Sequence, residues 1–410
     1  MNLFDMLKAD KGIPVSDPMA MLWGYQYRKK HSLSEISGVP PLHFTSRGEH
    51  LLDYRIYGNT VQDGTPTPET PVEVLGCGVK TTNLINIEQH NTENVSKSSD
   101  GSYFVYSYDK WCWCIPTEIG KTYCVSVSLM NEYKNSTKLE IALCKGYRTP
   151  YTPNGSAIIR ASLKDVEAYK IHTRTFKFTA TDEWLSINGM STHVYTIMIN
   201  EDSADLPYEP YGYKIPVTVS DGRNAVTTPV YIGSEPLHKI GDYADYVDFK
   251  RGVVVRNIKK IVLTGDENWL DNFHNANQNV YKIMNFANFR TLHISSANVG
   301  ILRCTHILYA YPYPSNLFDR IVLVDDNVHP HTLFFSTKKS MGFNTVTSFK
   351  NFLAEQYELG QPVTIWYIAA EPEEEPLENL LPIQTIKGSD VLTVGTTVQP
   401  SEMYIKYKKG

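Results

Sequence analysis

The chain has 410 residues, 42% hydrophobic and 20% charged, so it is long enough for two or three domains with separate cores and is not intrinsically disordered. Its formal net charge of -5 gives no general attraction to nucleic acid or to an anionic membrane, and no apolar run is long enough for membrane insertion. The 27 tyrosines and 23 prolines favour a mostly β fold, because tyrosine suits half-buried pleated surfaces and proline suits loops.

The start of the chain has an early acidic residue, Asp5, and lacks the long apolar region of a signal peptide. Six cysteines in 410 residues are too few for a disulfide scaffold. We therefore expect the chain to be made in a reducing cytoplasm and not to be secreted by the general route.

Residues 1–38 are predicted to form an N-terminal helical anchor. Asp17 precedes a proline, which is typical of a helix start, and Met19, Leu22 and Trp23 then share one helical face. Such a short apolar helix is not stable by itself. It packs either as a flap on its own domain or as an anchor on a neighbouring subunit, and the sequence leaves both open.

Strand-like alternation and dense turn residues in 39–83 predict a small β collar. In 84–206, several runs alternate apolar with polar or small residues, and clusters of asparagine, glycine and serine separate them. This pattern is typical of a β-sandwich or jelly roll. The clearest alternating sets are Tyr123, Val125, Val127 and Leu129, then Leu139, Ile141 and Leu143.

Residues 207–219 contain three prolines and three tyrosines, which predicts a stiff, extended strap rather than a flexible linker. Residues 220–410 return to strand alternation and form a C-terminal β-rich domain. One helix is expected near residues 348–359, after Thr347-Ser348 and before Gly360. The fold class is thus mostly β, with an N-terminal helical anchor, two or more sandwich or jelly-roll-like domains and one helix.

Known catalytic signatures are missing from the sequence: it has no nucleophile elbow, no phosphate-binding glycine loop and no zinc-binding helix motif. We therefore predict no catalytic residue and no cofactor. A glycosidase needs only two carboxyl groups, which spacing cannot reveal, so an enzyme stays open as an alternative.

Two small clusters could bind a metal. Cys112 and Cys114 would face the same way on a strand, with Cys124 on an adjacent strand, but their spacing is not that of a zinc site. His329 and His331 flank a proline with no further ligand nearby in sequence. We interpret the cysteines as small buried side chains and the histidines as loop residues, so no metal site is predicted.

Four aromatic residues are candidates for glycan binding: Trp111 and Trp113, with Tyr106 and Tyr108 just before them. Flat aromatic faces suit the C–H groups of sugar rings. The alternative is that the two tryptophans fill the core between the sheets, which is the more common place for paired tryptophans.

Several longer phrases are more specific than these motifs. They are Pro41-Leu-His-Phe-Thr, Leu52-Asp-Tyr-Arg-Ile-Tyr-Gly-Asn-Thr-Val-Gln-Asp-Gly-Thr-Pro, Thr82-Asn-Leu84, Ile197-Met-Ile-Asn-Glu201, Pro207-Tyr-Glu-Pro-Tyr-Gly-Tyr-Lys-Ile-Pro216, Gly241-Asp-Tyr-Ala-Asp-Tyr246, Glu371-Pro-Glu-Glu and Pro400-Ser. Together they resemble minor structural, tail or tail-fibre-like proteins of tailed bacteriophages and prophages of Gram-positive bacteria. The resemblance covers about residues 38–84 and 195–405.

This resemblance implies a virion component that is assembled in the host cytoplasm, with other tail or baseplate subunits as partners and a homo-oligomer, preferably a trimer. The family carries a carbohydrate-binding-like sandwich where this chain has 84–206, so a host-surface glycan is a further expected partner. It supplies no catalytic residue. The alternatives are a purely architectural or decoration protein of the tail or head and, third, a glycan depolymerase.

Overall fold

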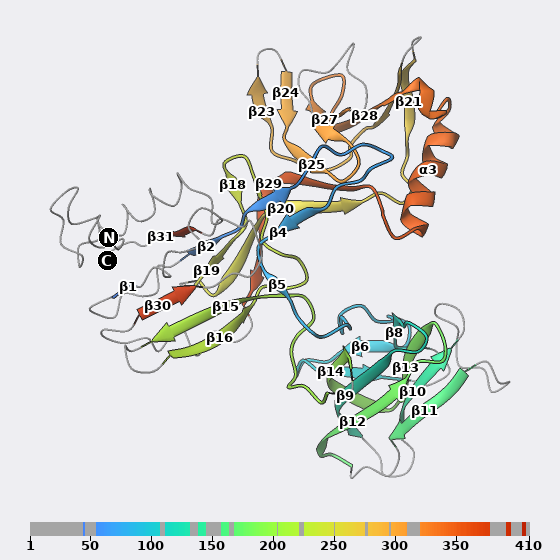
Figure 1. Cartoon of the computed structure of the whole chain (residues 1–410), viewed down its shortest axis with the longest axis vertical. Helices are drawn as coiled ribbons and strands as arrows, with labels where there is room; N and C mark the ends of the chain where they lie inside the picture. The colour runs from blue at the N-terminus through green and yellow to red at the C-terminus, as the bar shows by residue number, and fades with distance from the viewer. Residues whose placement is uncertain are drawn as a thin grey trace. The chain divides into compact units, whose positions relative to one another are not determined.

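The computed structural model divides the chain into two compact units, unit 1 (Met1–Val79 with Lys214–Gly410) and unit 2 (Lys80–Tyr213). The predicted mostly β fold with one α-helix is confirmed for the described residues (Figure 1). The structure describes residues 44–45, 55–106, 111–131, 138–144, 157–163, 168–202, 204–220, 225–249, 251–274, 278–294, 297–309, 320–377, 391–394 and 404–406.

The predicted N-terminal anchor, with its candidates Met19, Leu22 and Trp23, lies outside the described residues. Among the residues that are described, no helix has the length and apolar character to cross a membrane.

Unit 2 is a sandwich of two antiparallel sheets. The four-stranded sheet has the order β11 (Ala157–Leu163), β10 (Lys138–Cys144), β13 (Trp184–Met190), β8 (Trp113–Pro116). The five-stranded sheet has the order β12 (Ile171–Thr179), β9 (Thr122–Asn131), β14 (Thr192–Glu201), β7 (Tyr103–Val105), β6 (Val95–Lys97). Both are seen in the lower part of Figure 1.

One hydrophobic core lies between these two sheets, and the alternation of the sequence explains it. Every second residue of β9 and β10 points to the same side, so the predicted sets Tyr123 to Leu129 and Leu139 to Leu143 are buried together. Their backbone partners are equally regular, with Ile141 opposite Ile187 and Val125 opposite Ile199.

The two ends of unit 2 are held together by hydrogen bonds of the Asn83 side chain, which is buried. The Asn83 amide donates to the carbonyls of Ile197 (3.0 Å) and Glu209 (2.9 Å), and its oxygen accepts from the N–H of Ile199 (3.0 Å). The N–H of Thr81 donates to the carbonyl of Gly212 at 2.8 Å. The incoming segment therefore lies along the predicted strap.

The second half of the predicted strap is a strand, β15 (Tyr213–Ser220), in a sheet of unit 1. The sheet has the order β1 (Phe44–Thr45), β30 (Val391–Val394), β15, β16 (Ala225–Tyr231), and β5 (Val79–Lys80) also pairs with β15. Backbone hydrogen bonds to three neighbours thus add to the stiffness that proline confers on this stretch.

Two larger sheets form the rest of unit 1. One has the order β25 (Leu302–Cys304), β29 (Thr364–Pro376), β20 (Val253–Val262), β19 (Tyr246–Asp248), β2 (Arg55–Tyr57), β31 (Tyr404–Lys406). The other has the order β21 (Leu270–His274), β22 (Gln278–Ile283), β28 (Thr332–Lys338), β27 (Arg320–Asp325), β24 (Ala297–Gly300), β23 (Leu292–Ile294), with β26 (Leu308–Tyr309) parallel to β27. Hairpins β3 (Thr60–Gln62) with β4 (Val74–Gly76) and β17 (Lys239–Ile240) with β18 (Tyr243–Ala244) complete it.

The strands expected to form a local collar in 39–83 pair mostly with distant parts of the chain: β1 with β30, β2 with β19 and β31. Among the described residues of this stretch, β3 and β4 are the strands that form a local hairpin. Turn residues indicate where strands begin and end, but they carry no information about partners that are about 190 to 350 residues away.

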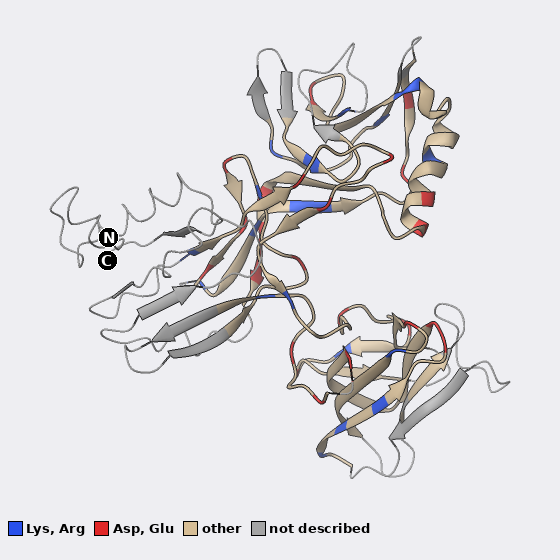
Figure 2. Cartoon of the chain, in the orientation of Figure 1, with Lys and Arg blue, Asp and Glu red and all other residues tan. Residues whose placement is uncertain are grey.

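The acidic stretch Glu371-Pro-Glu-Glu-Glu-Pro376 is not the solvated loop that its charge suggests. It is the second half of β29 and pairs with β20. Basic residues of unit 1 offset the acids, as in Lys259 with Glu373 at 2.9 Å and Arg251 with Glu374. Figure 2 shows a basic segment, in blue, on β20.

The predicted helix is α3 (Val346–Glu358). Thr345 caps it, because its hydroxyl accepts from the N–H of Ser348 while the Ser348 hydroxyl lies 3.1 Å from the N–H of Thr345. Its buried side is Phe349, which stacks on Tyr281 at 4.5 Å, and Leu353. Gly360, at φ 73°, follows the helix in the left-handed conformation that the sequence pattern anticipates.

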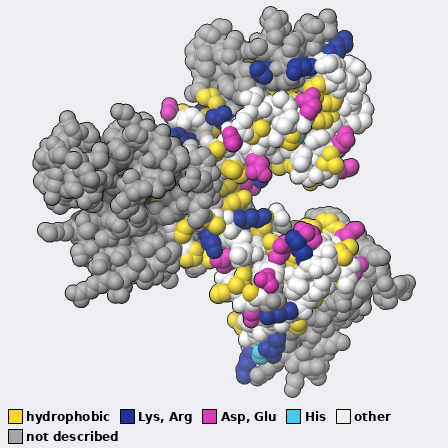
Figure 3. Space-filling view, in the orientation of Figure 1, with side chains coloured by type: hydrophobic (Ala, Val, Ile, Leu, Met, Phe, Trp, Pro, Cys, Tyr) yellow, Lys and Arg dark blue, Asp and Glu magenta, His cyan; other side chains and the backbone are white. Residues whose placement is uncertain are grey.

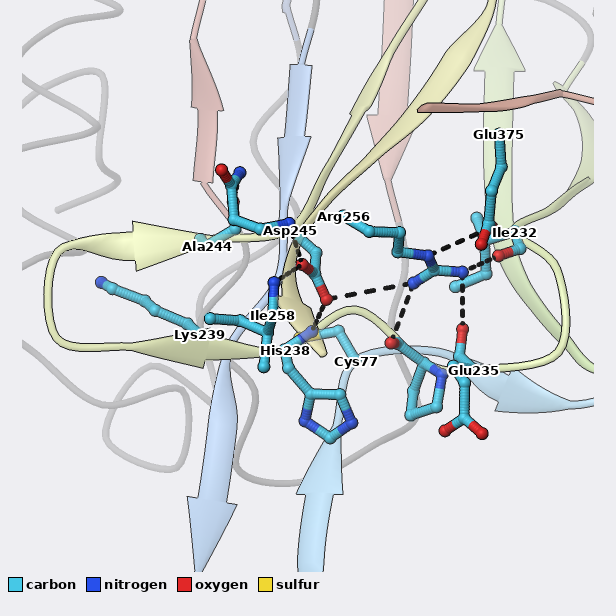
Figure 4. A network of polar contacts seen from close by, with 12 residues as sticks. Cys77, Ile232, Glu235, His238, Lys239, Ala244, Asp245, Arg256, Ile258 and Glu375 are labelled. Carbon is cyan, nitrogen blue, oxygen red and sulfur yellow. Dashed lines mark hydrogen bonds and ion pairs between the residues drawn. The ribbon is translucent and has the colours of Figure 1, made fainter. Parts of the chain in front are cut away.

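A buried ion pair, Asp245 with Arg256, organises the middle of unit 1 (Figure 4). The Asp245 carboxylate accepts the backbone N–H groups of His238, Asn257 and Ile258 at 2.7 to 2.9 Å. It therefore fixes the β17–β18 hairpin onto β20.

The Arg256 guanidinium satisfies its remaining donors locally. It donates to the carbonyls of Pro236 and Glu235, both at 3.0 Å, to that of Ile232, and to the carboxylate of Glu375 at 3.2 Å. Because each donor has an acceptor, this buried charge is tolerated.

Asp245 makes stability depend on pH. Burial raises the pKa of its carboxyl from 3.8 to about 6, although the backbone N–H groups and Arg256 act in the opposite direction. The folded state then binds the proton more tightly than the unfolded state, so this contribution is full below about pH 4 and is lost as the pH rises to about 6. We expect it to lower the free energy of unfolding of unit 1 by roughly 3 kcal/mol over that range.

The Asp245→Asn variant should lack this pH-dependent part of the free energy of unfolding, because an amide does not titrate. It should also be less stable at neutral pH by roughly 1–3 kcal/mol. The NH2 group of the new amide would face the backbone N–H groups that donate to Asp245, and two donors cannot form a hydrogen bond with each other. Chemical denaturation of both proteins between pH 4 and 7 measures the difference in slope. Parallel pH profiles would contradict the assignment.

Candidate functional site

A hollow of about 480 Å³ in unit 2 is lined by Gln89, His90, Asn91, Thr92 and Trp111. Two chain segments form it: the turn that precedes β6 and the residues that precede β8. The lining combines an indole, an imidazole, two amides and a hydroxyl group. Of these side chains, Trp111 alone is a candidate from the sequence.

Asparagine side chains stabilise the turns of the first segment, the one that precedes β6. The Asn86 and Asn91 amide oxygens each accept the backbone N–H two residues on, Glu88 and Glu93, at 3.1 Å. These are Asx turns, which asparagine forms readily because its side chain mimics a backbone turn. The carbonyl of Asn91 also accepts from the N–H of Asn94 at 3.0 Å.

Asn91 ties the two walls of the hollow together. Its N–H donates to the carbonyl of Cys112 at 2.9 Å, and its amide donates to the carbonyl of Trp111 at 3.1 Å. The position of Trp111 is therefore set by hydrogen bonds from the side chain and backbone of Asn91 on the opposite wall rather than by a strand of its own.

His90 connects the hollow to a buried aromatic cluster. Its ring meets Tyr103 edge-on at 5.4 Å and lies 6.4 Å from the ring of Trp113. Its Nδ1 lies 3.3 Å from the carbonyl of Ile87, which also accepts the indole N–H of Trp113 at 2.9 Å. These contacts hold the imidazole at a fixed angle.

A charged pair lies next to this turn. Lys97 donates to Glu88 at 2.7 Å and lies over the ring of Tyr103 at 5.5 Å. Although burial acts to raise it, hydrogen bonds from Lys97 and Tyr103 hold the pKa of Glu88 below its ordinary value. Glu88 is thus ionised at neutral pH and compensated by a neighbouring cation.

The four aromatic candidates do not form one surface. Trp113 is fully buried in the core, so its assignment to a glycan platform is wrong and the alternative interpretation as core holds. Trp111 is half-buried and lines the hollow. Tyr106 is 52% exposed on the outer face of the five-stranded sheet, and Tyr108 lies outside the described residues.

The expected alternation fails here because the regular strand begins only at Trp113. Trp111 and Cys112 precede it in an irregular segment, so a two-residue period does not place Trp111 and Trp113 on one face.

The three cysteines considered as a metal site do not lie on neighbouring strands of one sheet. β8 and β9 belong to different sheets, so Cys124 is not on a strand adjacent to Cys114. Cys112 is fully buried, and burial raises the pKa of its thiol to about 12. Across the described part of the chain, no three His, Cys, Asp or Glu side chains gather as a metal-binding group.

Ser102, His193 and Asp100 meet, but not as a nucleophilic triad. The Ser102 hydroxyl donates to Asp100 at 2.6 Å and lies 3.0 Å from His193 Nδ1. In a triad the histidine lies between the other two groups. Here the serine does, and it is fully buried, so this cluster offers no nucleophile.

Comparison with known proteins gives little beyond this geometry. No family model and no curated protein sequence matches the chain. One similar solved structure is a carbohydrate binding module from Cellvibrio mixtus lichenase 5A in complex with cellotriose, with 12% identity over 35% of this chain and 99% of that one, at a TM-score of 0.18. Another is the N-terminal CBM22-1-CBM22-2 tandem domain from Paenibacillus barcinonensis Xyn10C, with 8% identity over 78% and 98%, at a TM-score of 0.21. At these TM-scores neither likeness bears on function.

The two tryptophans should differ sharply in their contribution to stability. Trp113→Ala is expected to lower the free energy of unfolding by roughly 3–5 kcal/mol, because it leaves a cavity in the core. Trp111→Ala should lower it by less than about 1.5 kcal/mol, since the side chain is already half in solvent. Denaturation of the full chain followed by circular dichroism measures both, and equal losses would contradict this placement.

Proposed function

We propose that unit 2 is a glycan-binding module and that the hollow at Trp111 is its binding site. The observation that carries this proposal is the lining itself, an aromatic ring surrounded by the polar side chains of Gln89, Asn91 and Thr92. A sugar ring has apolar C–H faces and polar edges, so it needs a flat aromatic surface together with amide and hydroxyl partners.

Binding, rather than cleavage, suits this site. Glycoside hydrolysis in most enzymes uses a pair of carboxyl groups on either side of the bond. The lining residues that the structure describes include no aspartate or glutamate, and their amides and hydroxyl bind sugar hydroxyls without reacting with them. The protein is accordingly proposed to have no catalytic role.

For the whole chain, we propose a structural role in the tail tip, baseplate or fibre of a bacteriophage. The support is the set of sequence phrases that resemble those of phage structural proteins, notably in 52–72 and 207–216. In this role residues 1–38 attach the protein to neighbouring tail subunits, a trimer presents three copies of unit 2, and each copy contacts the host surface. The purely architectural protein is the competing proposal.

Trp111→Ala should weaken glycan binding without unfolding the protein. The probe is a purified cell-wall polysaccharide from a Gram-positive bacterium, with binding measured by calorimetry on the full chain. Loss of the stacking surface should raise Kd about tenfold. The matched control is Tyr357→Ala, which removes an exposed aromatic residue of α3 in unit 1 and should leave Kd unchanged.

Each other outcome selects an alternative. If the polysaccharide does not bind the unaltered protein, or if Trp111→Ala leaves Kd unchanged, the hollow is not the site and the architectural role is favoured. Release of oligosaccharides from the polysaccharide during incubation would instead support the depolymerase.

Deleting residues 1–38 should abolish incorporation into phage particles while leaving the remaining chain folded and its glycan affinity unchanged. Particle proteins are separated by gradient centrifugation and probed for the truncated chain, with the full chain as control. Normal incorporation of the truncated protein would rule out the anchoring role.

A further inference from the structure

The outer face of the five-stranded sheet in unit 2 carries one row of side chains that crosses all five strands. The registers put Ser96 opposite Phe104, Phe104 opposite His193, His193 opposite Met130, and Met130 opposite Ile171. Their sequence neighbours, such as Val105 and Leu129, point inward and are fully buried. By strand alternation this outer-face row points away from the core.

Apart from Ser96 at one end, the row consists of aromatic and apolar side chains, which are half-buried at Phe104, His193 and Met130 and exposed at Ile171. Phe104 lies 4.8 Å from the ring of His193 and meets Tyr106 edge-on at 5.1 Å. Tyr106 and Ile171, near its two ends, are 52% and 59% exposed. Hydrophobic side chains also show at the surface of the described part of unit 2 in Figure 3. Strands lie about 4.8 Å apart, so the row extends over about 19 Å.

An exposed tyrosine, Tyr169, lies two residues before Ile171 in an unusual backbone conformation. Tyr169 has φ 61°, which is unfavourable for a bulky residue, and its side chain is 70% exposed. Its N–H donates to the carbonyl of Asn131, next to Met130, which fixes this turn to the sheet. The Tyr169 backbone is thus held close to the Met130–Ile171 end of the row.

Hydroxyl and carboxylate groups border the outer-face row. Ser128 and Thr173 are paired across β9 and β12 with 2.8 Å between their hydroxyl oxygens. Next to His193, the hydroxyl of Tyr195 donates to Asp100 at 3.3 Å. Hydrogen bonds from Ser102 hold the pKa of Asp100 below its ordinary value, so it is an acceptor at neutral pH.

We propose that the outer-face row is a second glycan contact of unit 2, which binds an extended polysaccharide chain along its length. The inference rests on the proposed glycan-binding function but uses residues separate from those of the hollow. An apolar row of this length bordered by hydroxyls matches a linear sugar polymer, whose faces are apolar and whose edges are hydroxylated.

A protein partner fits this surface less well. The centres of protein interfaces are depleted of serine and aspartate. Ser96 at one end of the row, and Ser128 and Asp100 next to it, would lie within or beside any such interface, where losing water is unfavourable for them. A hydroxylated ligand replaces that water with hydrogen bonds.

The test compares fragments of one Gram-positive cell-wall polysaccharide that differ in length. Calorimetry on the full chain measures Kd for fragments of about two sugars and of at least about six. The variants are Tyr106→Ala and Ile171→Thr, with Ile119→Thr as the matched control because Ile119 is 66% exposed in the same unit and outside the row. Each row variant should raise Kd about fivefold for long fragments and leave Kd for short fragments unchanged.

The outcomes separate this inference from the proposed function. If Trp111→Ala weakens binding of every fragment while the row variants change nothing, the hollow stands and the row does not bind glycan. If only the row variants weaken binding, the row stands and the hollow does not. Row variants that alter the sedimentation of the protein without changing Kd would identify the row as a subunit interface and overturn the inference.

Discussion

Asn83 holds the two ends of unit 2 together, and the rest of that unit depends on this contact. Unit 2 interrupts the chain of unit 1, so its incoming and outgoing segments must leave the sandwich at one place. One buried amide achieves this by bonding to β14 through Ile197 and Ile199 and to the outgoing segment through Glu209. A buried amide is stable only when its hydrogen bonds are made. The Asn83 hydrogen bonds therefore also fix the first residues of the segment that leads to the hollow.

The hollow follows from the same use of asparagine. From Asn83 onward the chain forms no regular strand until β6. In place of strand pairing, the side-chain oxygens of Asn86 and Asn91 accept the backbone N–H groups of Glu88 and Glu93. The turn is rigid without being a strand, so its side chains can point into a hollow rather than alternate between faces. A binding surface of fixed shape loses less entropy when a ligand binds.

The hollow and the outer-face row of unit 2 are formed by different structural features. The hollow depends on irregular backbone and on Asn91, which joins two segments about 20 residues apart. The outer-face row depends on sheet register, which brings Phe104, His193 and Met130 into line from three separate strands. A compact hollow and an extended row together suit one polymeric ligand. When one contact of such a ligand is made, the second becomes intramolecular, so the two together give a higher affinity than either alone.

The sequence by itself determined the mostly β fold, the core alternation of β9 and β10, and the helix α3, because these depend on local periodicity and capping. It also singled out Trp111 as a candidate, and the structure places this side chain in the lining of the hollow. It could not place Trp113 in the core, because that depends on where an irregular segment becomes a strand. It could not reveal Gln89, His90 and Thr92 as a lining, although the run of polar residues before β6 was a usable signal. Only tertiary structure decided these points, since the partner of a residue in a sandwich is set by register and sheet order across distant segments, which local patterns do not encode.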